Sequence, residues 1–304
     1  MLDIAIMVEG QSGLTWPRWQ ALARAVEDLG FVGLYRSDHI VNPQLPDQDS
    51  LEAWTSLTWL ASHTRRIEFG TLVSPLTFRD PVTLARMASA VDDLSDGRLT
   101  LGVGAGWSHR EHQVFGFDLP PPNDRLDRLE EGLEVITRLL HSDQRVSFEG
   151  RYFRLHEALL LPRPRRQGGP RLLVAGRGRK RSLPLAARFA DEWNAMFLTP
   201  ATLAAMNAQL DELLEANGRR PADLRRTVMQ GVEVGRSETE LQRKLADRAW
   251  AFWREPGLIA GSPAQMVDQV GAFAEAGAQR IMLQWLDLDD LDGLEILARA
   301  VLPS

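Results

Sequence analysis

Asp38 and His39 stand at the end of a short apolar segment that begins at Val32 and predicts a buried strand. Imidazole titrates near neutral pH, so a histidine held at a strand end can serve as a general acid or base. A neighbouring carboxylate could stabilise its protonated form. The alternative is that the pair only caps the loop at 40–50. The sequence therefore offers His39 as the candidate acid–base residue and Asp38 as its electrostatic partner.

A second group, His109-Arg110-Glu111-His112, has the residue types of a metal site but not the spacing. Histidines three positions apart can share a helix face, whereas the zinc motif H-E-x-x-H places them four apart. No further ligand is implied, and the chain has no cysteine. We expect no metal here and interpret the group as the solvent-facing start of a helix with ion pairs.

A third group is basic and rich in glycine. Gly176-Arg177-Gly178 follows a predicted strand and precedes Arg179-Lys180-Arg181 at the start of a predicted helix. Glycines let a ligand approach the backbone, and the amides and dipole of a helix N-terminus attract anions. This pattern favours a phosphate site over a solvated basic surface. The nearby Arg163, Arg165 and Arg166 could extend the positive field over a longer anionic tail, although a charged surface loop is the simpler interpretation.

The elements that position these residues alternate regularly between strand and amphipathic helix. Capping patterns predict helix starts at Ser50, Asp80-Pro81 and Ser262-Pro263. Residues 108–170 interrupt the alternation with one helix, a hairpin-like stretch at 146–153 and a loop rich in proline and arginine. Because the alternation resumes unchanged, we interpret them as an insertion within a single domain, 1–304. The predicted strands are 3–8, 32–39, 67–73, 99–103, 171–175, 192–197, 227–234 and 280–285.

Eight strand–helix units predict an α/β fold of the (β/α)8 TIM-barrel type. A doubly wound sheet would carry a glycine-rich fingerprint after its first strand, and Glu9-Gly10-Gln11-Ser12-Gly13 does not match one. In a barrel the active site lies at the carboxyl ends of the strands. The candidate site residues are therefore Glu9, Gln11, Asp38, His39, Val73, Ser74, Thr77, Gly104, Gly106, Trp107, Gly176 to Gly178, Asn194, Glu233, Gln284 and Trp285.

Composition excludes several classes of protein. The 304 residues are 44% hydrophobic and 25% charged, as in ordinary globular proteins. The 35 basic and 41 acidic side chains give a net charge of −6, which argues against general nucleic-acid binding. No run approaches the roughly 20 apolar residues that cross a bilayer, and the absence of cysteine excludes disulfides and thiol chemistry. We expect a cytoplasmic protein with a small-molecule substrate and no nucleic-acid or membrane partner.

Segments spread over nearly the whole chain resemble the luciferase-like, flavin-dependent oxidoreductases, and more narrowly the branch that uses the 8-hydroxy-5-deazaflavin coenzyme F420. The order and spacing of the segments carry the resemblance, since no single one is diagnostic. They are Glu27-Asp28-Leu29-Gly30-Phe31, Arg36-Ser37-Asp38-His39, Gly70-Thr71-Leu72-Val73-Ser74-Pro75, Thr77-Phe78-Arg79, Gly97-Arg98, Leu101 to Trp107, Glu111-His112, Phe148 to Phe153, Ala186 to Asp191 and Ala276-Gly277-Ala278.

The resemblance implies a role for each matching position. It places a non-prolyl cis peptide bond at Leu72–Val73, behind the flavin ring, with Ser74 also among the cofactor-binding residues. Asp38 and His39 would contact the ring, and in alcohol-oxidising relatives this strand end removes a proton. The turn Gly104-Ala105-Gly106-Trp107 would line the ring and the substrate pocket, to which we also assign Glu9, Gln11 and Trp285. Gly176, Arg177 and Gly178 match the segment that holds the cofactor phosphate.

Relatives that oxidise sugar phosphates place a glutamate where Trp107 stands and a tryptophan near Pro43, and this chain has neither. We therefore do not expect a sugar-phosphate substrate, and Trp107 indicates an apolar pocket wall. The sequence predicts an F420-dependent oxidoreductase that transfers a hydride between C5 of the deazaflavin and a small organic substrate. That substrate would be an alcohol, an activated double bond or an imine. The alternatives are an FMN-dependent monooxygenase that uses oxygen and a non-catalytic flavin-binding barrel. Relatives often pair, so a homodimer is expected.

Overall fold

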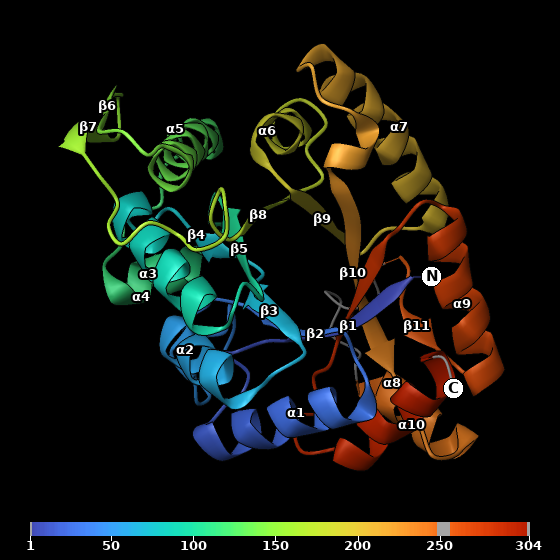
Figure 1. Ribbon diagram of the computed structural model, residues 1–304. Helices are drawn as coiled ribbons and strands as arrows, with labels where there is room; N and C mark the ends of the chain where they lie inside the picture. Colours follow the sequence, from blue (N-terminus) through green and yellow to red (C-terminus); the bar gives the residue numbers. More distant parts are fainter. Residues whose placement is uncertain (1, 248–255, 303–304) are drawn as a thin grey trace.

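The computed structural model describes residues 2–247 and 256–302, and within them eight parallel strands close into a barrel (Figure 1). Closure is made by the first and last strands, with Ile6 opposite Leu283. The predicted TIM barrel is thereby confirmed. In order around the barrel the strands are β1 (Asp3–Val8), β2 (Gly33–Arg36), β3 (Glu68–Thr71), β5 (Leu99–Gly104), β8 (Arg171–Ala175), β9 (Glu192–Met196), β10 (Arg225–Glu233) and β12 (Arg280–Gln284).

Helices surround the barrel and begin where capping chemistry predicts in two of the three cases. The Asp80 carboxylate accepts the backbone N–H groups of Val82 and Thr83 at 3.0 and 2.9 Å, and Ser262 forms a capping box with Gln265. The outer helices are α1 (Trp16–Leu29), α2 (Ala53–His63), α3 (Pro81–Leu94), α6 (Ser182–Phe189), α7 (Pro200–Ala216), α8 (Glu238–Asp247), α9 (Pro263–Glu275) and α10 (Leu291–Val301). Short additions are β4 (Ser74–Pro75) beside β5, β11 (Ile259–Ala260) beside β10, and the 3-10 helix Pro221–Asp223.

The predicted Ser50 cap is wrong. Helix α2 begins at Ala53, and Glu52 is its N-cap, with its carboxylate accepting a backbone N–H of the first turn at 2.6 Å. Ser50 instead forms an isolated parallel bridge with Leu14. Its hydroxyl donates to the carbonyl oxygen of His39 at 3.2 Å. Ser50 thus fastens the end of the 40–50 loop to the strand end that carries the candidate acid–base residue.

Between β5 and β8 the chain forms α4 (His109–Phe115), α5 (Pro122–His141) and an antiparallel hairpin of β6 (Val146–Glu149) and β7 (Arg154–Ala158). This confirms the helix and the hairpin that the sequence predicts inside 108–170. The Glu131 carboxylate on α5 accepts the backbone N–H groups of Arg151, Tyr152 and Phe153 at 2.9, 2.8 and 3.3 Å. One carboxylate therefore ties the hairpin tip to the helix.

Two hydrophobic clusters show which side of each strand faces the barrel interior. The larger cluster packs strands against helices, and the smaller fills the barrel with side chains that include Met7 and Met282. Because side chains alternate along a strand, Gln284 shares the inner side with Met282, and Glu9, just beyond β1, continues the inner alternation of Met7. Trp285 falls on the outer side and packs in the larger cluster.

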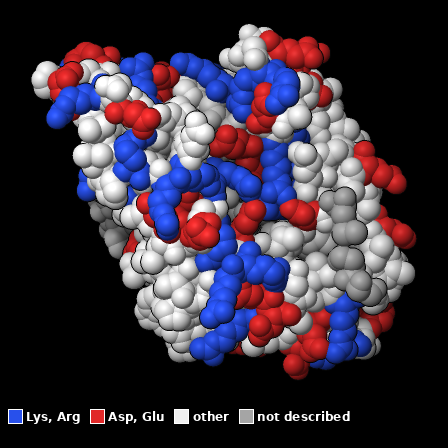
Figure 2. All heavy atoms as spheres, viewed as in Figure 1, with Lys and Arg blue, Asp and Glu red and all other residues white. Residues whose placement is uncertain are grey.

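On the face of the molecule shown in Figure 2, basic and acidic side chains are interleaved, with no broad area of one sign. Many of the arginines are paired with carboxylates, as Arg171 is with Glu68 at 2.9 Å. Over the residues that the structure describes, no helix combines the length and apolar character needed to cross a membrane.

Candidate active site

The chain leaves β3 through a cis peptide bond between Leu72 and Val73, at the place that the resemblance implies. The adjoining strand β5 is lined with glycine because no side chain would fit there. A Cβ on Gly104 would lie 2.5 Å from Cγ2 of Val73, and one on Gly102 would lie 2.0 Å from the carbonyl oxygen of Thr71. The backbone of β5 therefore packs directly against Thr71 and Val73, at the end of β3 near the mouth of the barrel.

Asp38 is buried, with 3% of its surface exposed. It accepts a hydrogen bond from Ser74 Oγ at 2.6 Å and a bidentate pair from Arg79, with Nη2 at 2.6 Å and Nε at 3.0 Å. Burial raises the pKa of Asp38 above its usual value, and the Arg79 pair opposes that effect. Its direct partners are thus Ser74 and Arg79, and the predicted electrostatic pairing with His39 involves no hydrogen bond. Asp38 acts on His39 only through its charge.

The hydrogen-bonding partner of His39 is Glu111, on the first turn of α4. Nδ1 of His39 lies 3.1 Å from Oε2 and 3.3 Å from Oε1 of a carboxylate whose side chain is 1% exposed. The same carboxylate accepts the backbone N–H of Ile40 at 2.5 Å. Burial lowers the pKa of His39, but the hydrogen bond and charge of Glu111, together with the charges of Glu9 and Asp38, outweigh burial and raise the pKa above its usual value. His39 therefore holds a proton more readily than a free histidine.

Trp107 forms one wall beside this pair. Its ring meets the ring of His39 edge to face, with 5.4 Å between centroids and 84° between planes. The indole is 48% exposed, while the His39 side chain is 21% exposed. This geometry agrees with an apolar wall next to a polar acid–base group that solvent still reaches.

The interpretation of 109–112 as a solvent-facing helix start is wrong for two of its four residues. Glu111 and His112 are 1% and 2% exposed, and Nδ1 of His112 lies 2.7 Å from the carbonyl oxygen of Ser108. Only His109 is exposed, while Arg110 is paired with Asp47 at 2.8 Å. No group of three or more potential ligands that could hold a metal occurs among residues 2–247 and 256–302. The pattern that could have revealed Glu111 is a carboxylate in the first turn of the helix that follows a predicted strand.

The ends of β1 and β12 carry a chain of amide and carboxylate contacts. Glu9 accepts N–H bonds from the side-chain amides of Gln284 at 2.7 Å and Gln11 at 3.0 Å. The hydroxyl of Ser37 donates to Gln11 Oε1 at 2.7 Å. Glu9 and Gln11 thus reach the barrel mouth as the sequence predicts, whereas Trp285, 3% exposed, packs against the outer helices.

The predicted phosphate segment lies at the end of β8, on the same edge of the barrel as His39. Gly176 has φ +148°, and a Cβ there would lie 2.8 Å from the Ser182 side chain, so a larger residue would not fit. Arg177 is exposed and donates to the carbonyl oxygen of Phe197 at 3.4 Å. Arg181 is paired with Asp127 at 2.5 Å. The exposed cations fit an anionic group, and its binding stays a prediction.

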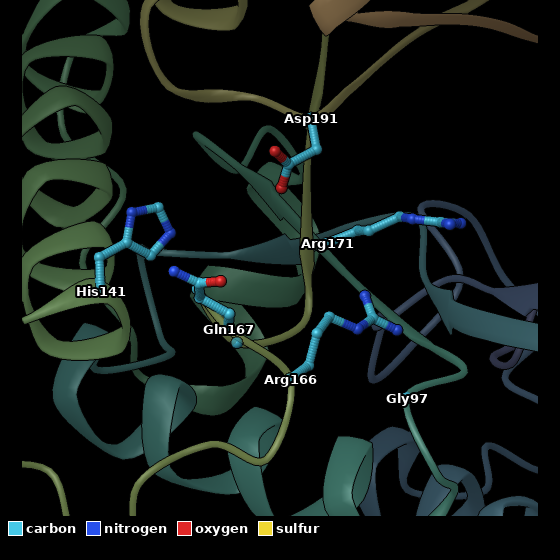
Figure 3. Close-up of a pocket in the computed structure, with 8 residues that line it drawn as sticks. Gly97, His141, Arg166, Gln167, Arg171 and Asp191 are labelled. Atoms are coloured by element: carbon cyan, nitrogen blue, oxygen red, sulfur yellow. The ribbon is translucent and has the colours of Figure 1, made fainter.

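The other arginine loop lies at the opposite end of the barrel. A cavity of about 480 Å³ opens where β5 and β8 begin (Figure 3). Arg166 on its wall is paired with Asp92 at 3.3 Å, and Arg163 donates to two carbonyl oxygens of α5. The idea that this loop extends the positive field over a cofactor tail is therefore wrong. The wall of the cavity is formed by Gly97, His141, Arg166, Gln167, Gly168, Gly169, Arg171 and Asp191.

A closed parallel barrel with a cis bond after its third strand and a paired histidine at its carboxyl edge defines a luciferase-like barrel. The model of the luciferase-like monooxygenase family matches residues 4–258, and the chain belongs to this family.

Two relatives and one solved structure illustrate the similarity. The chain is 31% identical over 234 residues to an F420-dependent glucose-6-phosphate dehydrogenase of Kineococcus radiotolerans, covering 74% of this chain and 66% of the relative. It is 33% identical over 243 residues to an F420-dependent hydroxymycolic acid dehydrogenase of Mycobacterium tuberculosis, covering 78% and 63%. The chain thus spans just under two thirds of the length of both relatives. Its fold matches the solved structure of an F420-dependent secondary alcohol dehydrogenase in complex with an F420–acetone adduct, with a TM-score of 0.84. The match has 21% sequence identity and covers 99% of this chain and 98% of that one.

Proposed function

We propose that this protein is an F420-dependent oxidoreductase that transfers a hydride between the deazaflavin and a small organic substrate. The observation that carries the proposal is the His39–Glu111 pair, held 3.1 Å apart at the carboxyl edge of the barrel next to the cis bond and Trp107. F420 dependence in two relatives above 30% identity supports the choice of cofactor.

The residues present fit such a cofactor. Glycines at 102, 104 and 176 let the strand ends pack tightly against Thr71, Val73 and Ser182, which keeps side chains of their own out of the barrel mouth. Arg177 and the exposed residues after it offer positive charge for a phosphate. When bound, the deazaflavin supplies a carbon that accepts or donates a hydride, and the protein supplies orientation and electrostatics.

Within this chain His39 is the group that holds and moves the proton. Its Nδ1 faces Glu111, which leaves Nε2 for the reacting oxygen or nitrogen of a substrate. Glu111 stabilises the imidazolium, in the way that a buried carboxylate orients a catalytic histidine. Asp38, held by Arg79 and Ser74, adds negative charge nearby and fixes the loop after β4.

A second candidate is an FMN-dependent monooxygenase, which the description of the matching family favours. The two candidates differ in the cofactor they need and in oxygen consumption. Fluorescence titration of the purified protein with F420 and, in parallel, with FMN separates them. Saturable binding of F420 in preference to FMN is expected. Preference for FMN would transfer the assignment to the monooxygenase, and binding of neither would remove both.

Turnover tests the role of His39. With F420 bound, a panel of alcohols, amines and activated alkenes is screened by the change in deazaflavin absorbance. For the best substrate, His39→Asn is expected to lower kcat by about 10²–10⁴-fold, the usual contribution of a general acid or base. The matched control is His109→Asn, an exposed histidine on the same helix as Glu111. Equal loss in both variants, or no loss in either, would refute His39 as the acid–base residue, whereas F420 binding without turnover of any substrate would leave a non-catalytic flavin-binding barrel.

We also propose that the protein is a homodimer, on the basis of the family resemblance alone. Light scattering of the purified protein gives its mass in solution, and a monomer would refute this part of the proposal. A cytoplasmic location stays a prediction from composition.

A further inference from the structure

Glu9 is a carboxylate at the barrel mouth that two neutral amides hold. Its oxygens accept from Gln284 Nε2 at 2.7 Å and Gln11 Nε2 at 3.0 Å. Throughout residues 2–247 and 256–302, no lysine, arginine or histidine lies within ion-pair distance of it. An amide neutralises no charge, and the cationic groups that act on Glu9, the buried Arg36 and His39, do so only from beyond ion-pair distance.

The other carboxylates at this edge differ in this respect. Asp38 carries a bidentate bond from Arg79, with the closer nitrogen at 2.6 Å. Glu233, at the end of β10, has the ammonium of Lys244 at 3.9 Å. A carboxylate near the site that has no ion-pair partner in the protein can be neutralised by a positively charged ligand. Glu9 is such a carboxylate.

The hydrogen-bond network also leaves an acceptor without a donor. Because Ser37 donates to Gln11 Oε1, the amide nitrogen of Gln11 must turn toward Glu9. The nitrogen of Gln284 is likewise directed at Glu9, which leaves its Oε1 fully buried and unpartnered in the described part of the chain. Buried polar atoms nearly always find a partner. Each oxygen of Glu9 already accepts one bond, so the acceptor that still requires a donor here is Gln284 Oε1.

A second unpartnered acceptor lies deeper in the barrel. Asn194 donates its amide nitrogen to Thr227 Oγ1 at 2.9 Å, and its Oδ1 is buried with no partner among the residues described. The inner side of the barrel from Glu9 through Gln284 to Asn194 thus offers acceptors and the charge of Glu9, while the buried Arg280 at the start of β12 is already paired with Tyr35 and Glu68. It suits a ligand rich in N–H donors and positively charged, and it suits an anion poorly.

We infer that the substrate of the proposed reaction carries a positive charge on the nitrogen beside its reacting carbon, as an ammonium or iminium, and that Glu9 is its counter-ion. This inference rests on the proposed function. In the oxidative direction an ammonium on a carbon that bears a hydrogen becomes an iminium, with one hydride passing to the deazaflavin and one proton passing to solvent through His39. The C–H bond and one N–H bond break, and a C=N double bond forms. The substrate carries one positive charge before and after, so Glu9 binds both forms and specifies the class of substrate.

Two probes of the same shape and different charge test the inference. Benzylammonium and benzyl alcohol share a ring and differ in the presence of a positive charge. Their dissociation constants are measured by calorimetry near neutral pH with the wild type, with Glu9→Gln and with Glu157→Gln. Glu157 is an exposed residue on the β7 strand, so its replacement removes one negative charge away from the barrel mouth.

The wild type and Glu157→Gln are expected to bind benzylammonium at least about tenfold more tightly than benzyl alcohol, the scale of a hydrogen bond to a charged group. Glu9→Gln is expected to lose this preference while keeping its binding of benzyl alcohol. Equal binding of the two probes by the wild type refutes the inference, as does a preference that survives in Glu9→Gln. Absence of binding of either probe refutes it as well.

The wild-type comparison stands even if Glu9→Gln fails to fold. F420 binding is titrated on the same samples and separates this inference from the proposed function. A protein that binds F420 but shows no preference for the cation retains the function and loses this inference. A protein that prefers the cation but binds no F420 retains the Glu9 site and loses the function.

Discussion

Replacing Glu111 by Gln tests whether this carboxylate sets the protonation of His39. The substitution keeps the shape and one hydrogen-bond acceptor but removes the charge 3.1 Å from Nδ1. Burial then acts on the imidazole with only the more distant charges of Glu9 and Asp38 to oppose it, so the pKa of His39 is expected to fall below that of the wild type, where Glu111 raises it. The rest of the site can remain in place. The bond from the backbone N–H of Ile40 can persist as a weaker contact to the neutral amide oxygen.

The magnitude follows from the chemistry of the pair. Two unit charges about 4 Å apart attract by about 4 kcal/mol at an effective dielectric constant near 20, and dehydration offsets part of this. Mutational values for a hydrogen bond to a charged group are about 1.5–3 kcal/mol, against about 1 kcal/mol for a neutral one. Glu111→Gln should therefore cost about 0.5–2 kcal/mol of unfolding free energy when His39 is protonated, because that is the difference between the two kinds of bond.

The pH dependence has a definite sign. The pKa of His39 is raised by folding, so the pair contributes fully below the ordinary histidine pKa of about 6.5, and the contribution is lost as pH rises through the folded pKa. Urea denaturation of wild type and variant at about pH 5.5 and about pH 9 is expected to show the larger destabilisation at the lower pH. A double-mutant cycle with Glu111→Gln and His39→Asn separates the energy of the His39–Glu111 pair from that of the bond between Glu111 and Ile40. NMR titration of the histidine rings, with His39→Asn for assignment, reads the pKa directly. A destabilisation independent of pH, together with an unchanged His39 titration, would refute the role of Glu111.

Three further outcomes follow from the same structure. Arg79→Met leaves the buried Asp38 carboxylate without its guanidinium and should cost about 3–5 kcal/mol in urea denaturation, and a loss below about 1 kcal/mol would contradict the pair. Gly104→Ala places a methyl group against the side chain across from it and should cost about 1–3 kcal/mol and weaken F420 binding. Gly271→Ala, with open space around it, is the control and should lose neither stability nor binding. Glu131→Gln should speed amide exchange at the hairpin tip, measured by NMR, and leave F420 affinity unchanged; equal protection in the variant would show that the carboxylate does not hold the tip.

Much of the fold could be predicted because its determinants are local. The apolar runs and helical periodicities locate the barrel strands and outer helices to within a few residues, and Asp80 and Ser262 cap the helices they precede. Ser50 misleads because a second capping residue, Glu52, stands two positions later. The choice between them depends on the bridge of Ser50 to Leu14, 36 positions earlier in the sequence, and such a contact leaves no local pattern.

The candidate site was harder to predict because its essential contact is long-range. His39 could be proposed from its type and its place at a strand end, but its partner lies 72 positions away. Proximity along the chain favoured Asp38, whose carboxylate is already engaged by Arg79 and Ser74. The cis bond at Leu72–Val73 likewise came from the family resemblance, since neither residue type requires it.

The direction of side chains at the barrel mouth was hidden for a different reason. In a sheet covered on both faces the strands are apolar at every position, so the alternation that marks the inner side of an exposed sheet is absent. In β12 the run Ile281 to Leu283 gives no sign that Met282 faces inward, and Trp285 could therefore be assigned to the pocket with the same ease as Gln284. Only the closed barrel separates them: Gln284 falls on the inner side beside Glu9, while Trp285 packs outside. The polar residue of that pair, and not the aromatic one, thus lies at the barrel mouth where the proposed substrate would bind.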